Sequence, residues 1–83
     1  MTNQDIQNDI ELMKKIVRGL QQEKYLKNEW IEKEKREIKE EYQDKVMIEI
    51  WTNRLKEIDL EIDVLEQAIK SSEAELKTEA LDN

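Results

Sequence analysis

The sequence predicts an all-α fold in which two long helices form an antiparallel, coiled-coil hairpin. Three observations support this prediction. Apolar residues recur every three or four positions in the second half of the chain, and a similar series runs through much of the first half. Charged residues make up 42% of the chain, with one glycine and no proline. Such a composition, combined with a helical period, is typical of long helices rather than of a β fold.

The first helix is predicted to begin near Asn3, because Thr2 and Asp5 have the spacing of a capping box. Its apolar residues then repeat by four and three, and the same phase continues through three charged positions before the turn. Ile16 widens this stripe. The predicted seam of the first helix comprises Ile6, Ile10, Met13, Val17, Leu20, Lys24, Lys27, Ile31, Glu34 and Ile38.

The second helix carries the more regular apolar stripe, in which only Ser72 is polar. An apolar stripe that repeats every 3.5 residues is stable only when another helix covers it. Residues 57–64 alternate apolar and acidic side chains as a strand would, but the stripe continues on both sides, so we assign them to the helix. The seam of the second helix comprises Ile48, Trp51, Leu55, Ile58, Ile62, Leu65, Ile69 and Leu76.

The repeat changes phase between Ile38 and Ile48, which predicts a turn there. We expect one domain, 1–83, with a first arm at about 3–39, a tip at about 40–44 and a second arm at about 45–79. In this hairpin, the numbers of two residues that face each other across the arms add to 82. Asp44 is predicted to cap the second helix. In the alternative register, in which the facing numbers add to 89, fewer apolar residues of one arm face apolar residues of the other. One long helix in a coiled-coil dimer, or three shorter helices, are the alternative folds.

The composition excludes most chemistry. Histidine and cysteine are absent, so catalytic triads and the usual zinc sites cannot form, and the acidic segments lack the glycine and spacing of a calcium loop. We therefore expect no enzyme, no metal and no cofactor. Residues 43–83 hold five Lys or Arg and eleven Asp or Glu, which disfavours direct binding to nucleic acid or to an anionic membrane. Without an apolar run of roughly 18 residues, a cytoplasmic protein is expected.

Four aliphatic residues are predicted to lie on the back of the second helix, away from the seam: Val46, Ile50, Leu60 and Val64. A two-helix hairpin buries one stripe per helix, so we expect these residues to contact a second copy, as a four-helix dimer, or another protein. The predicted function is a non-catalytic interaction module acting as a scaffold, adaptor or inhibitor. Its small size and Ile-, Lys-, Glu- and Asn-rich composition suit a phage or mobile-element accessory protein.

An alternative function follows from the acidic residues of the second helix. Carboxylates that imitate phosphates can occupy the basic cleft of a nuclease or DNA-binding protein. The predicted residues of such a decoy are Glu57, Asp59, Glu61, Asp63 and Glu66. Decoy binding should collapse as ionic strength rises, whereas apolar packing should persist.

Overall fold

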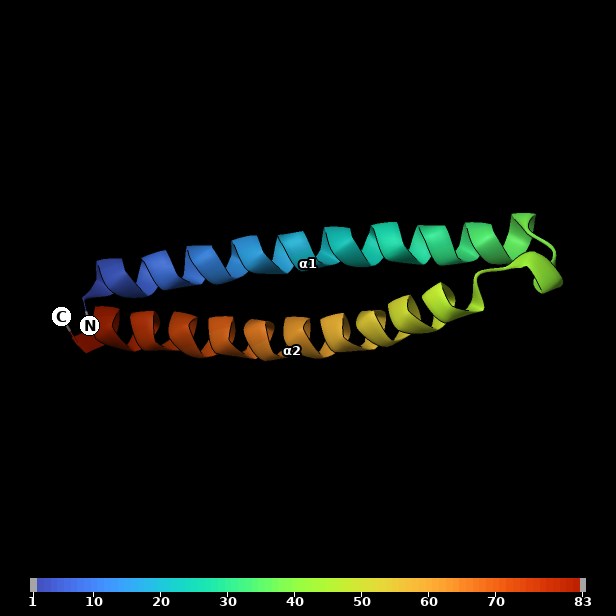
Figure 1. The fold of residues 1–83 in the computed structure, drawn as a ribbon. Coiled ribbons are helices and arrows are strands. Elements are labelled where there is room, and N and C mark those ends of the chain that lie inside the picture. The colour runs from blue at the N-terminus through green and yellow to red at the C-terminus, as the bar shows by residue number, and fades with distance from the viewer. Residues whose placement is uncertain (1, 83) are drawn as a thin grey trace.

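The protein is an antiparallel helical hairpin that measures 65 × 15 × 14 Å (Figure 1). The computed structural model describes the backbone of residues 2–82 and the side chains of residues 2–78. Helix α1 spans Asn3–Glu37, the short 3-10 helix η1 spans Glu40–Tyr42, and α2 spans Lys45–Asp82. The predicted hairpin is confirmed, and the alternatives of one long helix or three shorter helices are wrong.

The start of α1 is fixed by the predicted capping box. The Thr2 hydroxyl accepts a hydrogen bond from the Asp5 backbone N–H at 3.2 Å, and the Asp5 carboxylate accepts one from the Thr2 N–H at 3.4 Å. Both N–H groups belong to the first turn, where no helical carbonyl can accept them. Gly19 does not interrupt α1, because the helix continues through it.

The turn forms without glycine because side chains satisfy the exposed ends of both helices. The Gln43 amide donates to the carbonyls of Ile38 at 2.8 Å and Lys35 at 3.3 Å, which lie at the end of α1. The predicted Asp44 cap is confirmed, since its carboxylate accepts the Met47 N–H at 3.0 Å. The Asp44 N–H in turn donates to the Glu34 carboxylate at 3.2 Å, which ties the turn to α1.

The ends of the arms differ by a few residues from the prediction. Helix α1 stops at Glu37, and Ile38 adopts an extended conformation instead of continuing the seam. Helix α2 continues to Asp82, past the predicted end at about residue 79. The segment 57–64, with its strand-like alternation, is helical as assigned. None of the helices within residues 2–82 is long and apolar enough to cross a membrane.

The core follows the predicted seam most closely near the open end of the hairpin. Four buried residues form one cluster, Ile6, Ile10, Val17 and Ile69, against which Met13, Ile62, Leu65 and Leu76 pack. Nearer the turn, Ile31 and Ile58 are also buried. The seam prediction is wrong at Lys24, which is exposed, while Glu23 beside it is half-buried.

Contacts between the helices agree with the register in which facing numbers add to 82. Trp30 contacts Trp51, and Lys24 contacts Asp59, and each pair lies within one residue of that register. Two ion pairs of long side chains deviate more, Lys14–Glu73 at 3.9 Å and Glu23–Arg54 at 2.9 Å, and their residue numbers add to 87 and 77. Lys14 reaches that far because its side chain is long and half-exposed, so this pair does not set the helix alignment.

Candidate interaction surface

An open apolar groove runs between the two helices on one side of the hairpin. Its volume is about 440 Å³, and its lining residues are Ile16, Leu20, Leu60, Glu61, Val64 and Leu65. Leu60 is 68% exposed and Val64 is 66% exposed, although both side chains are aliphatic. Aliphatic groups around a concave surface favour contact with apolar side chains rather than with water. We call this feature the apolar groove.

The other two residues predicted for the interface lie closer to the turn. Val46 is 70% exposed and Ile50 is 52% exposed, so the predicted exposure of all four residues is confirmed. Ile50 borders a more polar hollow that is lined also by Glu23, Lys27, Trp51, Asn53, Arg54 and Glu57. Leu60 and Val64 thus share a groove, whereas Val46 and Ile50 continue the same face of α2 toward the turn.

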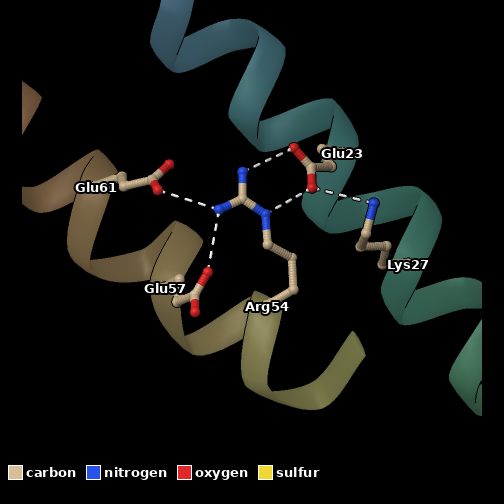
Figure 2. Close-up of polar contacts among 5 residues, drawn as sticks. All are labelled: Glu23, Lys27, Arg54, Glu57 and Glu61. Atoms are coloured by element: carbon tan, nitrogen blue, oxygen red, sulfur yellow. Dashed lines mark hydrogen bonds and ion pairs between the residues drawn. The ribbon is translucent and has the colours of Figure 1, made fainter. Parts of the chain in front are cut away.

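Arg54 lies at the centre of the polar contacts between the helices (Figure 2). Its guanidinium donates two hydrogen bonds to the Glu23 carboxylate of α1, at 2.9 and 3.2 Å. It also donates to Glu61 at 3.1 Å and to Glu57 at 3.4 Å, both on α2. Lys27 approaches the Glu23 carboxylate at 3.0 Å from the next turn of α1. A bidentate arginine–carboxylate pair is more specific in geometry than a single ion pair.

These contacts shift the protonation of the network. Hydrogen bonds from Arg54, and then from Lys27, lower the pKa of the Glu23 carboxyl from its ordinary value of 4.5 to about 2. Hydrogen bonds to Glu23 and Glu61 raise the pKa of the Arg54 guanidinium above its ordinary value. Both shifts favour the charged forms, so the Glu23–Arg54 pair remains ionised at neutral pH. This pair links α1 to α2.

An aromatic pair lies beside this network on the side of the turn. The rings of Trp30 and Trp51 meet edge to face, with centroids 4.6 Å apart and an interplanar angle of 63°. The Lys27 ammonium lies 5.4 Å from the Trp51 ring centroid, within the range of a cation–π contact. The two rings thus join α1 to α2 next to the charged part of the seam.

The five carboxylates of the predicted decoy do not share one face. Glu57 and Glu61 bind Arg54, while Asp59 pairs with Lys24 at 2.6 Å. Asp59 and Glu61 point about 200° apart around the helix, because each residue adds about 100°. Glu66 lines a separate groove together with the basic residues Lys14, Arg18 and Lys70. Asp63 accepts a hydrogen bond from Gln67 at 3.4 Å.

This arrangement disfavours the decoy hypothesis. Phosphate mimicry needs an array of unpaired negative charges over one surface, and three of the five carboxylates are paired with basic side chains of the same chain. The decoy stays a prediction, with less support than the interaction module.

Sequence reasoning missed two parts of this surface. Ile16 was noted only as widening the stripe of the first helix, yet it forms the α1 wall of the apolar groove. The predicted seam also did not include Glu23 or Arg54, and the structure places the Arg54 guanidinium between the Glu23 and Glu61 carboxylates. The spacing of Arg54, Glu57 and Glu61 at i, i+3 and i+7 was the signal that could have indicated this network.

No known protein family, curated protein or solved structure matches this chain.

Proposed function

We propose that this protein is a non-catalytic, coiled-coil interaction module that binds helices of other chains through its apolar groove and so acts as a scaffold, adaptor or inhibitor. The groove is the observation that carries the proposal. Its apolar walls come from both helices, and a helix laid against it can bury side chains at i, i+3 and i+4 spacing.

The exposure of the residues around the groove supports this proposal. Ile16, Leu60 and Val64 line the groove and are 45%, 68% and 66% exposed. A stable monomer has little reason to concentrate exposed aliphatic groups along one groove, because water contact with them is unfavourable. A bound helix would remove Leu60 and Val64 from water while leaving the seam of the hairpin unchanged.

A double substitution at the groove tests the proposal. Leu60→Glu with Val64→Glu places two charges where a partner helix would pack, and burying an unpaired charge is strongly unfavourable. We expect the variant to keep its helical circular dichroism and thermal midpoint but to lose at least tenfold in binding, measured as self-association and as capture of cellular proteins.

The matched control is Gln21→Glu with Gln22→Glu, which adds the same charge at two exposed positions of α1. The control should bind as the natural protein does. If the groove variant folds and binds as well as the control, the groove is only an exposed surface and the proposed function is wrong.

Binding measured at different ionic strengths distinguishes the interaction-module hypothesis from the decoy hypothesis. Binding through the groove should survive at 1 M salt, where the screening length is about 3 Å, whereas a decoy should release its basic partner. A cytoplasmic location and a phage or mobile-element origin remain proposals that rest on composition.

A further inference from the structure

The exposed back of α2 carries a second heptad series, which is distinct from the seam that faces α1. Its members are spaced alternately four and three residues apart, as in a coiled coil. All of them are exposed in the hairpin. We call this series the outer stripe, and it comprises Val46, Ile50, Asn53, Glu57, Leu60 and Val64.

The outer stripe has the same pattern when its direction is reversed. With Leu55 as the midpoint, the stripe pairs Val46 with Val64 and Ile50 with Leu60. Asn53 pairs with Glu57 at the centre. Apolar positions therefore face apolar positions, and the two polar positions face each other. In heptad terms each pair joins an a position to a d position, as antiparallel helices require.

We propose that two copies of this chain pair antiparallel through their outer stripes, with a twofold axis at the level of residue 55 on the exposed face of α2, to form a four-helix dimer. The inference rests on the proposed function and names its partner. A second copy fits because a twofold axis brings each surface against itself, so the surface must be complementary to its own reversed pattern. An unrelated helix would have no reason to match this midpoint.

The apolar groove supplies the deeper part of this interface. Leu60 and Val64 form its α2 wall. In the proposed register they face Ile50 of the partner subunit and Val46 of the partner subunit, so those two exposed aliphatic side chains pack against the α2 wall of the groove. The twofold symmetry repeats this contact, so the aliphatic residues of each hairpin pack against the groove of the other.

The polar centre fixes the register. The Asn53 amide can donate to the carboxylate of Glu57 of the partner subunit, and the symmetry mate repeats this hydrogen bond. A slip by one heptad would place Asn53 opposite Val64 of the partner subunit, leaving the amide without an acceptor. Polar residues within an apolar stripe select one register in this way at some cost in stability.

Basic side chains border the axis on both sides of the outer stripe. Arg54 is already paired with Glu23, Glu57 and Glu61. Lys56 is exposed and faces its own symmetry mate. Because this like-charge pair opposes association, moderate salt should strengthen the dimer, which is the opposite of the salt response of a charge-driven complex.

Disulfide trapping tests the proposed register directly, because the natural chain contains no cysteine. Val46→Cys and Val64→Cys are prepared separately, then mixed and oxidised at equal concentration. The mixture should give a disulfide-linked pair, and neither variant should cross-link alone. Residues 46 and 64 lie about 27 Å apart along the helix, far beyond the reach of a disulfide, so identical positions cannot meet in the antiparallel dimer.

Two substitutions of Asn53 give an independent test in the uncross-linked protein. Asn53→Asp places two like-charge pairs at the centre and should weaken dimerisation roughly three- to tenfold, whereas Asn53→Lys should strengthen it by a similar factor. Sedimentation equilibrium measures both dissociation constants, and circular dichroism checks that helix content is unchanged.

The outcomes separate this inference from the proposed function. A cross-link of Val46→Cys to itself would indicate parallel pairing and would overturn the inference. A chain that keeps its monomer mass of 10.0 kDa up to about 1 mM would overturn it as well. The natural protein could be monomeric and still capture other proteins, and the Leu60→Glu with Val64→Glu variant could fail to capture them. In that case the groove binds other proteins, and the proposed function stands without self-pairing.

Discussion

The two halves of the hairpin both bury aliphatic residues, but they differ in the contacts that accompany this packing. Near the open end, aliphatic residues of both helices form one cluster around Val17 and Ile69. Toward the turn, Ile31 and Ile58 are buried as well, and the helices are joined in addition by the Glu23–Arg54 pair and by the two tryptophans. Aliphatic packing supplies stability without direction, whereas bidentate pairs and edge-to-face rings require one geometry. We therefore expect the aliphatic cluster of the open half to contribute most to stability, and the directional contacts of the turn half to contribute most to the alignment of the helices.

The largest expected effect follows from removing a buried side chain in the open half. Ile69→Ala should lower the free energy of unfolding by about 2–5 kcal/mol, because the lost methyl groups leave a cavity between the helices. Lys35→Ala, at an exposed position of α1, should cost less than about 0.5 kcal/mol. Urea unfolding followed by circular dichroism measures both values. Equal losses would show that the aliphatic cluster is not the main source of stability.

An intermediate effect is expected from Glu23→Gln, and it should depend on pH. The pKa of Glu23 falls to about 2 in the folded protein, from an ordinary value of 4.5. Its contribution to stability is therefore fully present above pH 4.5 and is lost as the pH falls toward 2. The difference in thermal midpoint between natural protein and variant should shrink across that range.

Glu29→Gln serves as the control, because it removes an exposed carboxylate from the same helix. Its thermal midpoint should follow that of the natural protein at every pH. A Glu23→Gln difference that is the same at pH 2 and pH 7 would contradict a stabilising role for the ionised carboxylate.

A smaller effect is expected at the turn. Gln43→Ala removes the amide that donates to the Ile38 and Lys35 carbonyls. The expected loss is about 0.5–1.5 kcal/mol, since the carbonyls are exposed and water can replace the amide. Chemical denaturation measures it, with Gln21→Ala as an exposed helical control. A Gln43→Ala loss as large as that of Ile69→Ala would mean that the turn, rather than the aliphatic cluster, holds the hairpin closed.

The sequence predicted the fold wherever local periodicity decides the structure. The stripes of Val17 and Ile69, the Thr2 cap and the Asp44 cap follow from spacing alone, and all are present. Lys24 was misplaced because the contact face of α1 drifts around the helix where aliphatic residues are sparse. There, Glu23 is half-buried against α2, whereas Lys24 stays exposed and reaches α2 only through its ion pair with Asp59.

The candidate site was less predictable. Exposure of Val46, Ile50, Leu60 and Val64 followed from their positions on the helix. The groove needed Ile16 from the other helix, whose position relative to Val64 depends on the alignment of the arms. The Arg54 network likewise depends on the reach of long side chains, which heptad spacing does not specify.

The hairpin itself is the claim on which the groove and the outer stripe both depend. Spin labels at Gln7 and Glu75, two exposed positions, test it when labelled chains are diluted with unlabelled ones, so that only distances within a chain are measured. Packed helix axes lie 8–10 Å apart, so the hairpin places the labels within roughly 20–30 Å. One continuous helix would separate them by about 100 Å. A distance distribution centred below about 30 Å agrees with the hairpin, and the absence of any such component would contradict it.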